Sequence, residues 1–304
     1  MRARNWAVSL AVPLLAAIAV GIAAVIIVGA NNNVGTAPAA IDAGFPPARS
    51  AVADFSGAGA GTGTGAAVQV SAITAVGATQ VAAGSAANRP ALWVSQDGGS
   101  SWRRAAVTPL ANANANANHQ SGQIAWIAHG TAGWLAVGDT ATAATAAGTA
   151  AASQPLVLGS PNGSTWTVTG DAATFAGPGL VVTAAAAAGG AGYVIVGHTS
   201  VGARMAAAAW YAPGRTGWRR ASDARPGALD GPANRVMNAV TATSRGFVAV
   251  GAVGAAPAAW LSGTGRTWTL VPLPLPVGAA SAALDFVAAD GGSVAAVGTE
   301  VTAS

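Results

Sequence analysis

A short hairpin pattern that ends in tryptophan recurs four times along the chain, and this recurrence limits what the chain can fold into. The first copy, residues 93–102, reads WVSQDGGSSW. The later copies are LGSPNGSTW (158–166), WYAPGRTGW (210–218) and WLSGTGRTW (260–268). Each copy places apolar residues on both sides of a turn rich in small and polar residues, which is typical of a β-hairpin. The copies therefore predict a chain built from repeated β units.

A second repeated segment, an apolar run that ends in glycine, gives the length of the unit. Its glycines lie 54, 59, 54 and 47 residues apart, at Gly84, Gly138, Gly197, Gly251 and Gly298. The longest units contain the low-complexity stretches 111–118 and 140–152, which we expect to be loops. Without them the period approaches that of a four-stranded propeller blade. Because one such sheet cannot bury both of its faces, the units should stack radially as an all-β propeller.

The strand count of the last unit predicts how the propeller closes. In the second unit we expect strands at 123–128, 133–138, 155–159 and 165–169, whereas the last unit has two, 283–288 and 292–298. An open ring would leave unpaired strand edges that favour aggregation. We therefore expect an N-terminal strand at 51–55 to complete the last blade and close the ring at five. The alternatives are a truncated chain with further blades missing, and a β-sandwich, which the even spacing of the hairpins disfavours.

The N-terminus predicts one transmembrane helix. Arg2 and Arg4 precede an uncharged apolar run, residues 6–30, which is long enough to cross a bilayer and longer than the apolar part of most cleaved signals. The flanking arginines predict a single-pass anchor in the cell membrane with the propeller on the extracytoplasmic side. The alternative is secretion after cleavage behind Ala30. The expected domains are a membrane anchor or signal segment (1–30), a Pro/Gly/Ala-rich linker (31–66) and the propeller (67–304).

The composition argues against several classes of function. All fourteen basic residues are arginine and the formal net charge is +4, a field too weak for a nucleic-acid-binding surface. The absence of cysteine excludes disulfides, thiolate catalysis and cysteine-bound zinc. His119, His129 and His198 lack the spacing of metal ligands, and no phosphate-binding motif is present, so we expect neither a metal site nor a cofactor.

The first hairpin resembles the Asp-box, or bacterial neuraminidase repeat, of sialidase-like β-propellers. Residues 95–102 match S-x-D-x-G-x-[ST]-W at every fixed position, and the later copies are looser and replace the Asp. In that family the box is a fold device, in which the Asp or Asn side chain accepts hydrogen bonds from the turn and the Trp packs between blades. The resemblance assigns this structural role to Ser95, Asp97, Gly99, Trp102, Asn162, Trp166, Trp218 and Trp268.

The resemblance does not extend to the catalytic residues of sialidases. A sialidase-like site needs three arginines, a tyrosine nucleophile, a glutamate that activates it and an aspartate, whereas this chain offers Tyr193, Tyr211 and Glu300 in unsuitable positions. The catalytic residues are thus missing, and we expect no enzymatic activity. The alternative is a divergent sialidase-like glycoside hydrolase that uses carboxylates on its loops.

Polar residues that are otherwise scarce gather in two sets of predicted loops. Loops from strand 2 to strand 3 and from strand 4 to the next strand 1 should share one face around the axis, where function usually lies. We expect a ligand site there, formed by Asp139, His198, Arg204, Asp223, Arg225, Asp230 and Arg235, for a protein, peptide or glycan at the cell envelope. The alternative for these residues is solvated turns with weak ion pairs. A third possibility is an assembly factor whose role is recognised through its partner.

Overall fold

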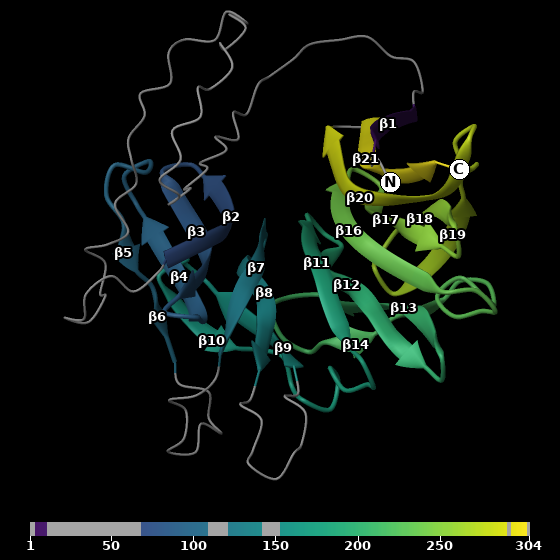
Figure 1. Cartoon of the computed structure of the whole chain (residues 1–304). Helices are drawn as coiled ribbons and strands as arrows, with labels where there is room; N and C mark the ends of the chain where they lie inside the picture. The colour runs from purple at the N-terminus through teal and green to yellow at the C-terminus, as the bar shows by residue number, and fades with distance from the viewer. Residues whose placement is uncertain (1–3, 11–67, 109–120, 142–152, 291–292, 303–304) are drawn as a thin grey trace, which may run out of the picture.

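The fold is all-β. The computed structural model describes residues 4–10, 68–108, 121–141, 153–290 and 293–302, and these residues contain no helix. The described residues therefore include no helix that could cross a membrane. The strands assemble into five separate sheets, which Figure 1 shows in chain order from blue to yellow. This arrangement is consistent with a β-propeller, and five sheets do not fit the two facing sheets of a sandwich.

Four of the sheets follow the predicted unit of four antiparallel strands. The first sheet contains β2 (Val68–Val76), β3 (Thr79–Ala86), β4 (Arg89–Ser95) and β5 (Arg103–Arg104). The second contains β7 (Ser121–Gly130), β8 (Gly133–Ala141), β9 (Ser153–Ser160) and β10 (Thr165–Val168). The third contains β11 (Val181–Ala188), β12 (Gly192–Val201), β13 (Arg204–Ala212) and β14 (Arg219–Arg220). The fourth contains β16 (Arg235–Thr243), β17 (Gly246–Val253), β18 (Ala256–Ser262) and β19 (Thr267–Pro272).

Two short strands connect neighbouring sheets at the outer edge. After β5 the chain continues into β6 (Ala106–Val107), which pairs in parallel with β10 of the second sheet. In the same way β15 (Ser222–Asp223) follows β14 and pairs in parallel with β19 of the fourth sheet. Each outer strand therefore covers part of the edge of the next sheet, which limits the exposed edge on that side.

The fifth sheet is completed by an N-terminal strand, but at a different place from the one expected. Its order is β20 (Ala279–Asp290), β21 (Ser293–Thr302) and β1 (Arg4–Leu10), with Ala7 opposite Val297. The strand expected at 51–55 lies outside the described residues. Residues 6–10 of the expected transmembrane helix are part of β1, and residues 11–30 also lie outside the described residues. Backbone pairing with β21 thus competes with helix formation at the start of the apolar run.

The recurring position requires glycine for the same steric reason in all five sheets. In each innermost strand a β-bulge follows the residue that pairs with this glycine, for instance between Val182 and Ala184 beside Gly197. The bulge pushes a backbone carbonyl into the space where a Cβ would lie, so that a side chain on Gly197 would overlap the carbonyl oxygen of Val181. Equivalent overlaps occur at Gly84, Gly138, Gly251 and Gly298.

Apolar side chains fill the spaces between consecutive sheets. Leu135 and Val137 of β8 pack with Tyr193, Ile195 and Trp210 of the third sheet, while the alternate residues of β8 face the first sheet. The buried tryptophans at the ends of the later hairpins, Trp166, Trp218 and Trp268, each lie in a cluster between two sheets. Burial of a large aromatic side chain contributes roughly 1.5–3 kcal/mol of stability.

The five sheets form a series in which neighbours touch through their innermost strands. These contacts join β2 and β3 to β7, β7 to β11, β11 to β16, and β16 to β20. Among the described residues, β20 and β2 make no contact of comparable extent, and the first and last sheets stand at the two ends of the series (Figure 1). Apolar side chains are exposed on both end sheets, with Ile73 on β2 and Phe286 on β20. The structure therefore differs from the sealed ring expected.

Candidate functional site

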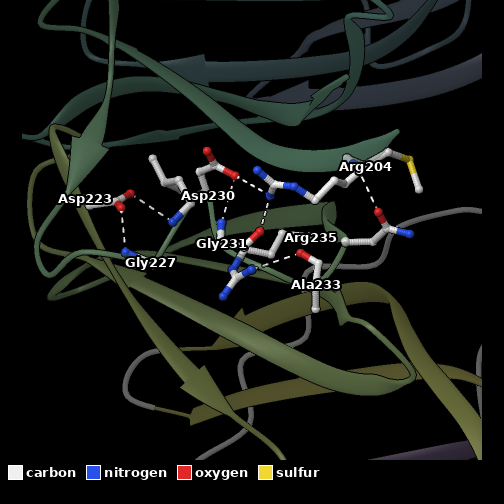
Figure 2. Close-up of polar contacts among 10 residues, drawn as sticks. Arg204, Asp223, Gly227, Asp230, Gly231, Ala233 and Arg235 are labelled. Atoms are coloured by element: carbon white, nitrogen blue, oxygen red, sulfur yellow. Dashed lines mark hydrogen bonds and ion pairs between the residues drawn. The ribbon is translucent and has the colours of Figure 1, made fainter. Parts of the chain in front are cut away.

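The loop between β15 and β16, residues 224–234, brings together four of the expected site residues. Figure 2 shows Arg204, Asp223, Asp230 and Arg235 around this loop, with their hydrogen bonds drawn. Arg204 begins β13 in the third sheet, whereas the loop leads into the fourth sheet. A strand 2 to strand 3 hairpin and a strand 4 to strand 1 loop are thus in contact here.

Asp223 shapes this loop from within. Its carboxylate accepts hydrogen bonds from the backbone N–H groups of Gly227, at 3.0 Å, and Leu229, at 2.8 Å. The loop in turn presents two carbonyls to the sheets, because Leu229 accepts a hydrogen bond from the N–H of Ala207 and Ala228 accepts one from the indole of Trp260. Both oxygens of Asp223 therefore hold the loop against the third and fourth sheets.

Arg204 and Asp230 form an ion pair across the same loop. The guanidinium Nη1 lies 2.8 Å from Oδ1 of Asp230 and also donates a hydrogen bond to the carbonyl of Gly231. The hydrogen bond from Arg204 holds the pKa of Asp230 below its usual value. Because the side chains are 36% and 53% exposed, the pair contributes on the order of 0–1 kcal/mol. It is a surface contact that links the start of β13 in the third sheet to the loop before the fourth sheet.

Arg235 and Arg225 differ in how accessible their side chains are to a ligand. Arg235 is 7% exposed, donates from Nη1 to the carbonyl of Ala233 at 2.9 Å, and has no hydrogen-bond partner for its Nε among the described residues. Arg225 is exposed at the start of the loop. Of these two arginines, Arg225 is thus the one whose side chain a ligand could reach directly.

Asp139 lies in a pocket between the second and third sheets. The pocket has a volume of about 260 Å³ and is lined by Gly138, Asp139, Ser153, Pro155, Leu180, Val181 and Val182. Asp139 pairs with Pro155, and Ser153 pairs with Ala141, so these three side chains share the face of the second sheet that is turned toward the third. Leu180 and Val182 supply the opposite, apolar wall.

The carboxylate of Asp139 is half-buried and unneutralised. Burial raises the pKa of this carboxyl and is the sole cause of the shift, so no described cation compensates it. No described residue donates a hydrogen bond to its oxygens, in contrast to Asp223 and Asp230. A partly desolvated acid of this kind, in a pocket, is a site at which a ligand can provide the missing hydrogen bonds.

His198 follows the recurring glycine of the third sheet, as Asp139 does in the second, but it lies on the face of its sheet that is turned toward the fourth sheet. It shares the face of β12 with Val194 and Val196, which pack against Met237 and Val240 of the fourth sheet. Burial lowers the pKa of His198, and its Nδ1 has no hydrogen-bond partner among the described residues. Asp139, in the second sheet, therefore faces one side of the third sheet, whereas His198 lies on the other side. The two residues were expected in one site, and the third sheet separates them.

The hairpin turns that resemble Asp-boxes carry a repeated set of hydrogen bonds. Ser160 Oγ accepts from the N–H of Gly163 at 2.8 Å, Asn162 Oδ1 accepts from Ser164 and Thr165, and Trp166 Nε1 donates to the carbonyl of Gly163. Ser95, Asp97, Gly99 and Trp102 make the corresponding bonds in the first copy, with Asp97 accepting from Ser101. Ser262, Gly265 and Trp268 do so in the fourth.

The third copy departs from this arrangement. Ala212 takes the place of Ser160, and the glycine with positive φ is Gly217 rather than a residue three before the Trp. The indole N–H of Trp218 is buried without a hydrogen-bond partner among the described residues. Phe175 packs edge-on against Trp218 with 5.9 Å between ring centres, so this Trp is held by apolar contacts.

The apolar wall of the pocket is what the sequence did not reveal. Leu180 and Val182 are ordinary apolar residues at the start of a strand, and nothing in their spacing marks them as ligand contacts. Asp139 was expected as a scarce polar residue on a predicted loop, and it lines this pocket. Within the described residues, no group of three His, Asp or Glu side chains is placed to hold a metal ion.

Comparisons with known proteins give distant structural likenesses. No protein-family model matches the chain, and no curated protein matches its sequence. Among solved structures, YCF48 bound to D1 peptide is 14% identical at a TM-score of 0.42, and the match covers 73% of this chain and 57% of that one. A glycoside hydrolase is 11% identical over 77% and 89%, at a TM-score of 0.34. β-1,2-Mannobiose phosphorylase from Listeria innocua, with β-1,2-mannobiose, is 11% identical over 70% and 67%, at 0.30. The chain thus spans little more than half the length of the YCF48 chain.

Proposed function

We propose that the chain is a non-catalytic β-propeller that binds a protein, peptide or glycan ligand at the cell envelope. The observation that carries this proposal is the pocket between the second and third sheets, where the half-buried carboxylate of Asp139 faces apolar walls and no described residue satisfies it. The lining combines apolar side chains, such as Leu180 and Val182, with the polar groups of Asp139 and Ser153, and such a combination can orient a bound ligand. The pocket also lies beside the loop that leads into β11, on a scaffold of paired strands.

The described carboxylates favour binding over glycoside hydrolysis. Hydrolysis by either common mechanism needs two facing carboxyl groups. In the pocket, Asp139 is the one carboxylate among the described lining residues. Asp223 accepts hydrogen bonds from the backbone of the loop, and Asp230 accepts one from Gly231 of the loop and one from Arg204 of β13, so both carboxylates already have partners. These contacts support a structural role for both.

We further propose that the propeller lies outside the cytoplasm. The apolar run at 6–30 would anchor the chain, the segment 31–66 would separate the anchor from the propeller, and the propeller, 67–304, would have five blades. In the anchored form residues 6–10 would leave β21 for the membrane, because a strand of the propeller cannot also lie in the hydrocarbon core. Secretion after cleavage behind Ala30 is the alternative, and the N-terminal sequence of the mature protein distinguishes the two.

Arrays of peptides and glycans, probed with the full chain, test the proposed function. We expect saturable binding to one of the two ligand classes, weakened at least about tenfold by Asp139→Asn, because a hydrogen bond to a charged group contributes about 1.5–3 kcal/mol. The variant Asp290→Asn, at an exposed position on β20, is the matched control and should bind normally. Turnover of aryl glycosides that disappears in Asp223→Asn or Asp230→Asn would overturn the non-catalytic assignment.

A further inference from the structure

Two junctions between neighbouring sheets are built in a similar way and differ in how their acidic residues are paired. At each junction the strand 2 to strand 3 end of one sheet lies near the loop that leads into the next sheet. At the junction of the third and fourth sheets, Arg204 pairs with Asp230 of the loop. At the junction of the second and third sheets, a pocket is lined by Asp139 of the sheet and Leu180 of the loop. Asp230 is thus paired with a cation of the chain itself, whereas Asp139 has no described cationic partner.

The walls of the pocket between the second and third sheets are suited to one kind of side chain. Leu180, Val182 and Pro155 would contact an aliphatic stem, and Asp139 would pair with a positive charge at its end. Ser153 adds a hydroxyl on the same face as Asp139. Lysine and arginine combine an apolar stem with a charged head and bury the stem along apolar surface. A carboxylate that is partly removed from water gains more from such a partner than an exposed one does.

From this we infer that the pocket between the second and third sheets is a subsite for a cationic side chain, of lysine or arginine type, on a peptide ligand. This inference rests on the proposed binding function and narrows it from three ligand classes to one. A ligand cation would pair with Asp139 as Arg204 pairs with Asp230. The pocket would thereby select for basic peptides over neutral glycans.

Methyl NMR of the full chain tests the subsite directly. The chain, labelled at Leu and Val methyls and held in detergent micelles, is titrated with blocked tripeptides whose central residue is lysine, arginine, norleucine or glutamate. We expect the lysine and arginine peptides to shift the methyl signals of Leu180 and Val182 in a saturable manner. The norleucine peptide, which keeps the stem and lacks the charge, should bind at least tenfold more weakly, and the glutamate peptide should not bind.

Two variants separate the carboxylate from the rest of the pocket. Asp139→Asn keeps the size of the side chain and should reduce the affinity for the lysine peptide about tenfold or more, whereas Asp290→Asn removes the same charge elsewhere and should leave it unchanged. Equal binding of the lysine and norleucine peptides, an unchanged affinity in Asp139→Asn, or no shift of these methyls with any peptide would overturn the inference. If a glycan from the arrays shifts the same methyl signals while the basic peptides do not, the result supports the proposed function and contradicts the cationic subsite.

Discussion

The side-chain amide of Asn238 donates a hydrogen bond to the backbone carbonyl of Leu284, at 2.9 Å, and so joins the innermost strands of the fourth and fifth sheets. Asn238 is the extra residue of the bulge in β16. Thr183, the extra residue of the bulge in β11, makes the equivalent bond to the carbonyl of Met237 at 2.6 Å. In β11 and β16 the bulge beside the recurring glycine thus places a polar side chain where it bonds to the next sheet.

Removal of this contact should destabilise the junction between the two sheets. Asn238→Ala leaves the carbonyl of Leu284 without its donor, and we expect a loss of about 1 kcal/mol in the free energy of unfolding. Urea denaturation followed by tryptophan fluorescence measures it. Gln69→Ala, which truncates an exposed amide on β2, serves as the control and should change stability little. Equal effects of both substitutions would remove the proposed role of the bulge residue.

Alanine at a recurring glycine should be far more damaging than alanine at a loop glycine. In Gly197→Ala the new Cβ would overlap the carbonyl oxygen of Val181, and overpacking of this kind costs about 1–3 kcal/mol or more. At Gly214 an added Cβ meets nothing within 4 Å, so Gly214→Ala should be neutral or slightly stabilising. Thermal unfolding of the two variants makes the comparison, and a normal melting temperature for Gly197→Ala would contradict the steric explanation.

The tryptophans of the second and third hairpins should respond differently to the loss of their indole N–H. Trp166 donates to Gly163 at 2.8 Å, whereas Trp218 has no described partner. Trp166→Phe should therefore cost about 1 kcal/mol more in unfolding free energy than Trp218→Phe, since both lose similar apolar area. Chemical denaturation of the two variants gives this difference directly, and a larger cost for Trp218→Phe would show that its indole N–H is bonded.

Asp97 should make the first turn sensitive to acid. Hydrogen bonds from Ser101, and then from Ser95, lower the pKa of Asp97 from 3.8 to about 2. Because the folded pKa is the lower one, the stabilisation by ionised Asp97 is present above pH 3.8 and is lost as the pH falls toward 2. Asp97→Asn should flatten this part of the stability profile yet keep the turn, since Asn162 accepts the equivalent bonds in the second copy. An unchanged pH profile in Asp97→Asn would exclude Asp97 as the titrating group.

The pairing of β1 with β21 can be tested because the chain has no cysteine of its own. Ala7 and Val297 are opposite each other, so Ala7→Cys with Val297→Cys should form a disulfide under mild oxidation when the N-terminal strand is in place. A shift in electrophoretic mobility that reducing agent reverses detects it. In membranes, the proposed anchor at 6–30 predicts little of this disulfide, and its efficient formation there would exclude the anchored form.

The repeat was predictable from the sequence because its causes are local. Each unit needs glycine where a neighbouring carbonyl approaches, and its turn needs Ser, Asn and Gly, so these residues recur in the sequence. The expected strands of the second unit therefore agree with the observed ones: 123–128, 133–138, 155–159 and 165–169 all lie in observed strands, except for Thr169, one residue past β10. The closing strand was not predictable in the same way. An apolar run that begins at Trp6 suits a strand edge and a bilayer equally well, and pairing with β21 depends on residues almost 300 positions away.

The candidate site was predictable in part for a similar reason. Scarce charges on predicted loops led to Asp139, Arg204, Asp223 and Asp230, and the structure gathers the last three. It could not be foreseen that Asp223 is bonded to the loop backbone, that Asp230 is paired with Arg204, or that Arg235 is buried, because these contacts depend on how the loop folds back on the sheets. The alternation along β12, which turns His198 away from Asp139, depends on which face each neighbouring sheet covers.

The pH dependence of peptide binding tests the central claim, that Asp139 forms a ligand site, more directly than any other measurement. Because burial raises its pKa above 3.8, the carboxylate should lose its charge, and with it the affinity for the lysine tripeptide, as the pH falls through that raised value. The account predicts a dissociation constant that rises at least tenfold on acidification in the natural protein and stays flat in Asp139→Asn. The same dependence in both proteins would contradict it.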